Sequence, residues 1–148
     1  MSYHERKSIV ASVSSVLTTV IYSVYVYQRY LAEGAEILNS PQFWGVTFFV
    51  FILVSIVAGI LVTIGFTIHY RLTTKETEPT ITDERDALIE LKATRNSYYA
   101  FIAGVLLSMG LLALNMPLWG TFIGLTYSGL VASVVDDATQ FYLYRRGF

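Results

Sequence analysis

Two adjacent aspartates, Asp136 and Asp137, are the ionisable side chains best placed to do chemistry in this sequence. They follow 40 consecutive residues, 96–135, that carry no charge. A carboxylate at the end of such an apolar tract is costly unless it is paired, so we expect a cationic partner. If the tract folds back on itself near its middle, positions 136 and 137 come level with 96 and 97, which makes Arg95 their natural partner. The structural use of this cluster is an ion pair between two helices, and its alternative use is a proton or cation site.

The two aspartates cannot face the same neighbour, because adjacent positions of a helix point about 100° apart. A stripe of small residues precedes them at intervals of four: Gly120, Gly124, Ser128 and Ala132. Such a stripe lets a neighbouring helix pack closely, and Asp136 continues it, so Asp136 is expected to point into the bundle. Three basic residues then remain as partners for Asp137: Arg85, Lys92 and Arg146. The sequence leaves open which aspartate pairs with Arg95.

The two histidines, His4 and His69, give a weak indication of a metal or haem site. Both are expected at the same face of the membrane, and imidazole is a common ligand of metals. No His-x-x-x-His pair and no carboxylate–histidine spacing accompanies them. We therefore expect interfacial histidines and no cofactor or metal, with a site at His4 and His69 as the weaker alternative.

Other signatures of chemistry are missing from the sequence. It has no phosphate-binding glycine loop, no nucleophile elbow and no zinc-protease motif. It has no cysteine, which removes disulfides, thiolate metal sites and cysteine nucleophiles. Its net charge of −1 argues against a nucleic-acid surface, which needs a clustered basic excess. We expect a protein that is not an enzyme and binds no nucleic acid.

Charge is concentrated in one segment between two apolar tracts. Residues 80–95 hold four of the eleven acidic and three of the ten basic residues of the chain. The run from Thr80 to Asp83 resembles a capping box, which predicts a helix that starts near Asp83. Acidic residues come first in this helix and basic ones later, the order that the helix dipole favours. Its candidates for docking a partner are Asp83, Glu84, Arg85, Asp86 and Lys92.

This charged helix is expected to run without a break into the apolar tract that follows. Leu88, Leu91, Arg95 and Ile102 fall on a common helical face, which favours one continuous helix. The alternative is a break near Asn96, which would let the charged helix before it lie along the membrane surface.

The elements that position these residues are expected to be membrane-spanning helices of a single domain, residues 1–148. Hydrophobic residues make up 54% of the chain and charged residues 14%, far below the quarter or so that is usual in soluble proteins. Uncharged stretches predict four spans, at about 9–28, 43–69, 97–114 and 118–141. The last two are separated at Asn115-Met116-Pro117, because proline cannot continue the preceding helix. The fold class is therefore all-α, an integral membrane four-helix bundle of two helical hairpins joined by a charged segment.

The distribution of lysine and arginine predicts the orientation of these spans. Nine of the ten basic residues lie before the first span, between the second and third, or after the fourth, and only Arg29 lies on the other side. The side with more positive charge is cytoplasmic, so both termini are expected in the cytoplasm. A bias this clean is typical of a multi-pass protein of a prokaryotic inner membrane.

The first span carries two further patterns. Small polar residues share one of its faces and are expected to hydrogen-bond another helix: Ser8, Ser12, Ser15, Thr19 and Ser23. Aromatic residues gather towards its far end and next to the following spans: Tyr22, Tyr25, Tyr27, Tyr30, Trp44 and Trp119. We interpret the aromatic residues as an interfacial belt, with a tyrosine-lined ligand pocket as the alternative.

The run Asp83-Glu84-Arg85-Asp86 is followed by a spaced set of residues and then by an apolar span. The set is Ile89, Lys92, Ala93, Arg95 and Ser97. This pattern resembles the motif of a family of small four-span membrane proteins of unknown function found in bacteria and archaea. The resemblance covers residues 83–97 directly. It implies four helices with a charged cytoplasmic segment and brings no activity, substrate or catalytic residue.

Two functions fit these patterns. The first is a regulatory or accessory protein that docks a partner at the cytoplasmic face through the helix at 80–95. The second is a subunit of an oligomeric channel or transporter that uses the cluster of Arg95, Asp136 and Asp137. The expected partners are the lipid bilayer and either a second copy of the chain or another protein.

Overall fold

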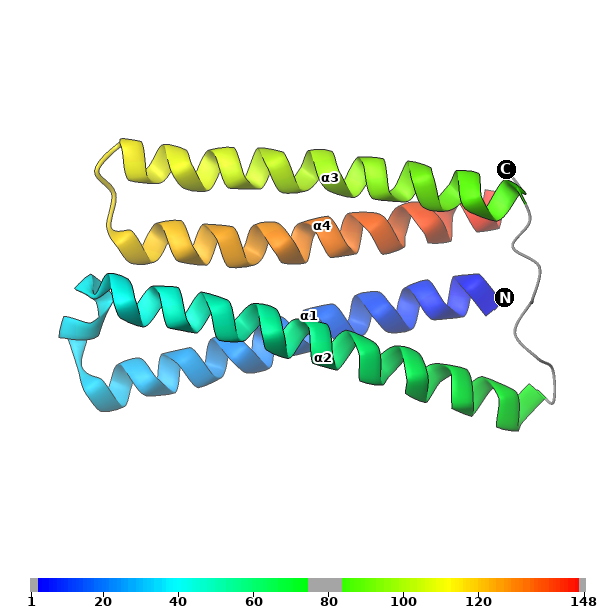
Figure 1. The fold of residues 1–148 in the computed structure, drawn as a ribbon, viewed down its shortest axis with the longest axis horizontal. Helices are drawn as coiled ribbons and strands as arrows, with labels where there is room; N and C mark the ends of the chain where they lie inside the picture. Colours follow the sequence, from blue (N-terminus) through cyan, green and yellow to red (C-terminus); the bar gives the residue numbers. More distant parts are fainter. Residues whose placement is uncertain (1–2, 75–83, 147–148) are drawn as a thin grey trace.

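The computed structural model describes residues 3–74 and 84–146 of the chain. Four long helices dominate this part: α1 (Tyr3–Glu33), α2 (Pro41–Thr74), α3 (Glu84–Ala113) and α4 (Leu118–Arg146), with a short 3-10 helix, η1 (Ala35–Asn39), between the first two (Figure 1). Each long helix is long and apolar enough to cross a membrane. The all-α class and the four helices of spanning length are thereby confirmed, and the chain has the character of a multi-pass membrane protein.

α3 confirms the prediction of a continuous charged helix. It runs without interruption from Glu84 through the charged segment and the apolar tract to Ala113. The predicted capping box, Thr80 to Asp83, lies outside the described residues. All four helices extend past the uncharged stretches, so the bundle continues beyond the apolar layer at the end where the two termini lie (Figure 1). We call this end the termini end and the opposite one the turn end.

The turn between α3 and α4 forms where proline interrupts the apolar tract. Asn115 adopts a left-handed conformation with a φ of 56°. Its backbone N–H donates to the Leu112 carbonyl at 3.1 Å, and that of Met116 donates to the Leu111 carbonyl at 3.0 Å. These two bonds are those of a Schellman motif, in which asparagine takes the place usually held by glycine. The predicted break at 115–117 is therefore confirmed.

The connection between α1 and α2 is also built from local signals. Gly34 ends α1 with a φ of 86°, a conformation that glycine adopts without steric cost. Ser40 caps α2, because its side-chain Oγ accepts a hydrogen bond from the backbone N–H of Phe43 at 3.2 Å. Pro41 opens the helix at the position where its missing N–H costs nothing.

Three of the helices contact one another, and the fourth packs on one side of this group. α4 packs on α1 and, over a smaller area, on α2, and α1 crosses α2, whereas α3 packs on α4 and comes within 8 Å (Cα–Cα) of neither α1 nor α2 in the described part. Figure 1 shows α3 and α4 side by side and α2 crossing in front of α1, with α2 diverging from the others at the termini end. α3 is therefore an edge helix with one covered side.

The contact between α3 and α4 is built from two reciprocal glycine–serine pairs. Gly104 of α3 faces Ser128 of α4, and Gly124 of α4 faces Ser108 of α3. Both serines are buried, and each donates its hydroxyl hydrogen bond to the carbonyl of the glycine four residues earlier. Without side chains on the glycines, the two backbones approach closely enough for dispersion contacts to hold the helices together in lipid. This seam explains why α3 and α4 stay side by side as an antiparallel pair (Figure 1).

The contact between α1 and α4 is a polar seam. Ser15 and Ser133 lie with their Oγ atoms 2.9 Å apart, and Ser8 and Thr19 are buried beside them. The expectation that hydroxyls of the first span bond another helix is therefore confirmed for Ser15, with α4 as that helix, whereas Ser8 and Thr19 donate to carbonyls of α1 itself.

Candidate functional site

The two aspartates lie on α4 beyond the seam with α1, and both are half-buried. Asp136 accepts a hydrogen bond from Gln140 Nε2 at 2.8 Å. Asp137 has one buried carboxylate oxygen, Oδ2, with no hydrogen-bond partner. The aspartate with the unpaired buried atom is thus Asp137, although the small-residue stripe had pointed to Asp136 as the inward one.

The predicted ion pair between Arg95 and these aspartates is absent from the described residues. Arg95 is exposed, and no hydrogen bond or salt bridge joins it to either carboxylate. The predicted depth was right, since Asn96 Nδ2 lies 3.5 Å from Thr139 Oγ1. The face was wrong, because Arg95 sits about 100° round the helix from Asn96 and points away from α4. The predicted cluster of Arg95, Asp136 and Asp137 is therefore reduced to the two aspartates, and Arg95 lies on another side of α3.

The charged half of α3 has one covered face and one open face. Ile89 and Ala93 are completely buried, although they lie in the segment predicted to meet a partner. Asp86 is half-buried beside the Tyr144 hydroxyl, so this half of α3 lies against the C-terminal end of α4.

The open face carries both charge and apolar surface. Leu88 is 50% exposed and Leu91 is 66% exposed, and Arg95 and Ile102 continue the same side of the helix. The sequence had placed these four residues on one face, and none of the other described helices covers that face. Of the docking candidates, Glu84 and Arg85 are exposed, Asp86 and Lys92 are half-buried, and Asp83 lies outside the described residues.

The two histidines lie in different surroundings at the termini end. The His4 ring stacks on the Tyr144 ring with centroids 4.6 Å apart and planes 9° apart. His69 is exposed on α2 and lines a hollow together with Arg6 and Tyr70. No group of three or more potential metal ligands is found in residues 3–74 and 84–146.

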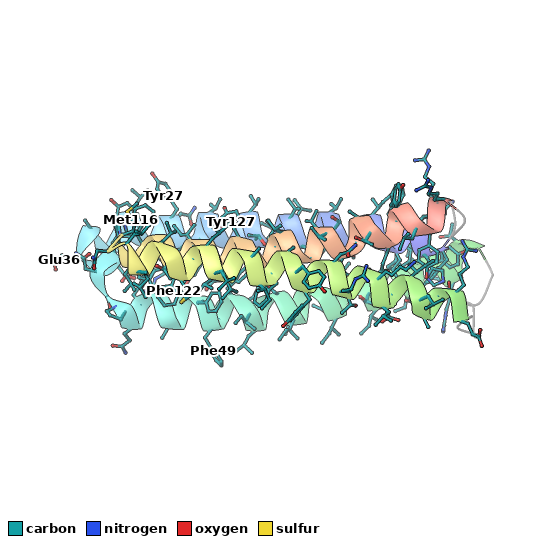
Figure 2. The ribbon with its side chains drawn as sticks, turned by 90° about the horizontal axis from the view of Figure 1, so that it is seen from above. Tyr27, Glu36, Phe49, Met116, Phe122 and Tyr127 are labelled. Carbon is teal, nitrogen blue, oxygen red and sulfur yellow. The ribbon has the colours of Figure 1, made fainter. Side chains whose placement is uncertain are left out.

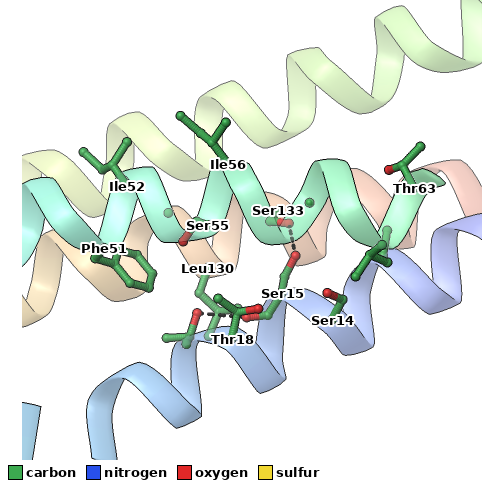
Figure 3. Close-up of a pocket in the computed structure, with 15 residues that line it drawn as sticks. Ser14, Ser15, Thr18, Phe51, Ile52, Ser55, Ile56, Thr63, Leu130 and Ser133 are labelled. Carbon is green, nitrogen blue, oxygen red and sulfur yellow. Dashed lines mark hydrogen bonds between the residues drawn. The ribbon is translucent and has the colours of Figure 1, made fainter. Parts of the chain in front are cut away.

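A hydroxyl-lined cavity of about 440 Å³ lies where α1 crosses α2, with α4 behind them. Figure 3 shows its polar lining, which comes from three helices: Ser14, Ser15, Thr18, Ser55, Thr63 and Ser133. The Ser15–Ser133 hydrogen bond crosses its floor. Asp137 follows Ser133 by one helical turn, so the polar seam continues from this cavity towards the termini end.

An aromatic cavity, also of about 440 Å³, lies at the turn end between α1, α2, η1 and α4. Eight of its lining residues are aromatic: Tyr22, Tyr27, Tyr30, Trp44, Phe48, Trp119, Phe122 and Tyr127. Of the side chains interpreted as an interfacial belt, all but Tyr25 therefore also line a space, as the alternative interpretation required. Periodicity alone could not choose between the two, because enclosure depends on the angle between α1 and α4.

No protein family, curated protein or solved structure gives a significant match to this chain. The resemblance of residues 83–97 to a family of small four-span membrane proteins therefore stays a prediction.

Proposed function

We propose that the protein is a non-catalytic regulatory or accessory protein of a prokaryotic inner membrane, which docks a protein partner through the open face of α3. The observation that carries this proposal is the exposure of Leu88 and Leu91, 50% and 66%, on an edge helix that packs on α4 alone among the described helices. Both leucines precede Asn96, where the uncharged tract begins, so they lie beyond the apolar layer.

The physical argument is the cost of leaving large apolar side chains in water. Covering one leucine contributes roughly 1.5–3 kcal/mol, and two leucines on one face make a small but favourable anchor. Charged neighbours on the same segment, Glu84, Arg85 and Arg95, supply orientation and specificity more than affinity. The same face continues into the membrane through Ile102, so a membrane partner could contact α3 on both sides of the interface.

The proposed orientation has support from the placement of charge in the fold. Arg6, Arg71, Arg85 and Arg146 belong to the termini end, whereas Arg29 lies next to the turn end and is engaged by Glu33. The termini end is therefore the proposed cytoplasmic side.

A photo-reactive residue placed in native membranes tests the docking proposal. We expect a discrete cross-linked adduct from position 91 that is lost when Leu88→Asp is added. Leu72 provides the matched control, because it is a leucine at the same end of the molecule, 78% exposed, on α2. Equal adducts from positions 72 and 91, or no adduct from position 91, would contradict docking through α3.

The second candidate, a subunit of an oligomeric channel or transporter, draws on a different observation. The hydroxyl-lined cavity and the unpaired Asp137 oxygen lie along the α1–α4 seam, while Arg95 lies away from it. A path would therefore use Ser133 and Asp137 within one chain rather than the predicted three-residue cluster. A proton or cation flux assay in proteoliposomes tests it, and an unchanged flux in Asp137→Asn would contradict it.

A further inference from the structure

We propose that the aromatic cavity at the turn end binds a flat, uncharged, lipid-soluble ring that carries hydrogen-bond acceptors, the chemistry of a quinone. The inference stands apart from the proposed docking function, because the cavity lies at the opposite end of the molecule from Leu88 and Leu91.

One wall of the cavity is flat and held in place. The rings of Trp44 and Phe122 are stacked with centroids 6.2 Å apart and planes 16° apart, and Phe48 meets Phe122 edge-on at 6.1 Å. Trp44 is only 6% exposed, and its indole Nε1–H donates to the Leu38 carbonyl at 3.0 Å. A ring that packs on this wall gains stacking contacts without reordering these side chains, which lowers the cost of binding.

Three tyrosine hydroxyls of the cavity are donors without a partner among the described residues. The Tyr22 hydroxyl is already occupied, since it donates to the Thr47 carbonyl at 2.8 Å. The hydroxyls of Tyr27, Tyr30 and Tyr127 make no hydrogen bond with any described residue, and each can donate one. A ligand with carbonyl oxygens around its ring would accept these bonds.

The lining of the cavity carries no charged side chain. Its residues are aromatic, aliphatic, serine or threonine, with no acidic, basic or histidine side chain among them. An anion would find no counter-charge there, and a cation would meet aromatic faces that attract it but no carboxylate that neutralises it. Because the lining offers hydroxyl donors and no charged group, an uncharged ring with acceptors fits it best.

Access to the cavity is from the side that would face lipid. Tyr27 and Tyr127, 60% and 45% exposed, lie on the same side of the molecule in Figure 2, and Ile123 beside them is 40% exposed. A volume of about 440 Å³ falls in the range of small-molecule sites. A ring can enter from the bilayer and leave an apolar tail among the lipids.

The chain reports on this cavity with its own fluorescence. It contains two tryptophans, Trp44 and Trp119, and both line the cavity. The probe is 2-methyl-1,4-naphthoquinone, added to the full chain in phospholipid nanodiscs. We expect the quinone to quench the tryptophan fluorescence in a saturable way. The hydrocarbon 2-methylnaphthalene, which has the same rings without carbonyls, should displace the bound quinone only weakly. The double variant Tyr30→Phe/Tyr127→Phe should weaken binding by at least fivefold, whereas the control Tyr98→Phe, on the exposed side of α3, should not.

Three results would overturn the proposal. Quenching that rises linearly with quinone, and equally in the double variant, would indicate collisions in the bilayer only. Displacement by 2-methylnaphthalene as effective as by the quinone would show that acceptors are not recognised. Tighter binding of benzyltrimethylammonium would indicate a cation site. The tyrosine-to-phenylalanine changes keep the rings, so a folded double variant is expected, and its far-ultraviolet circular dichroism checks this directly.

Discussion

Gly104 of α3 lies directly against Ser128 of α4, with no room between them for a side chain on the glycine. A Cβ at position 104 would lie 2.6 Å from the Ser128 Cβ and 3.2 Å from its Cα. Gly124 meets Ser108 in the same way from the other helix, with 3.2 Å left to the Ser108 Cβ. Two antiparallel Gly-x-x-x-Ser segments, 104–108 and 124–128, thus hold α3 and α4 together; we call this contact the clasp.

This contact predicts a selective sensitivity to a single methyl group. Gly104→Ala should lower the free energy of unfolding in mixed micelles by about 1–3 kcal/mol, because Ser128 is buried and cannot move aside. Ser128→Gly in the same chain should restore part of the loss. Gly110→Ala is the control, since nothing lies within 4 Å of a Cβ there, and it should be neutral or slightly stabilising. Equal effects at 104 and 110 would argue against the clasp.

The exposed position of Arg95 predicts that its removal is tolerated. Arg95→Ala should change the free energy of unfolding by less than about 0.5 kcal/mol, as for other surface substitutions. Asp137→Asn should leave stability unchanged or raise it, because the substitution removes an unpaired charge from a half-buried site. Unfolding in mixed micelles measures both. If Arg95→Ala protein failed to fold and recovered when Asp136→Asn or Asp137→Asn was added, the result would support the ion pair that the sequence predicted.

The hydrogen bond between Ser15 and Ser133 predicts a small coupling between α1 and α4. A double-mutant cycle with Ser15→Ala and Ser133→Ala should give about 0.6 kcal/mol, the average for such bonds in membranes. Ser14 lines the same cavity and makes no hydrogen bond to Ser133, so a cycle of Ser14→Ala with Ser133→Ala should give none. A coupling for Ser14 as large as that for Ser15 would place the contact elsewhere.

The left-handed Asn115 predicts an order of stability among three residues at one position. Asn115→Gly should keep or raise stability, since glycine adopts a positive φ without cost. Asn115→Val should lower it by about 1–2 kcal/mol, because a β-branched side chain clashes with the backbone in this conformation. Thermal unfolding in detergent, followed by circular dichroism, ranks the three proteins. A valine variant as stable as the wild type would show that the turn takes another conformation.

Local patterns were sufficient to predict the helices and their breaks. An uncharged run of spanning length forms a helix in lipid wherever it falls, because every backbone hydrogen bond must be made internally. Proline at 117 interrupts a helix through its own backbone, so the turn between α3 and α4 followed from the sequence as well. The shared hydroxyl face of α1 was equally readable, because the spacing of Ser8, Ser15 and Thr19 defines a face without reference to any neighbour.

Tertiary structure decided how these helices meet. The depth at which Arg95 would lie relative to Asp137 followed from counting residues, but its direction depends on the rotation of α3 about its own axis. That rotation is set by Gly104 and Ser108 against Ser128 and Gly124, a match between two surfaces that neither segment reveals alone. The edge position of α3, its free face and the aromatic cavity arise in the same way, because close approach in lipid depends on which small residues happen to face one another.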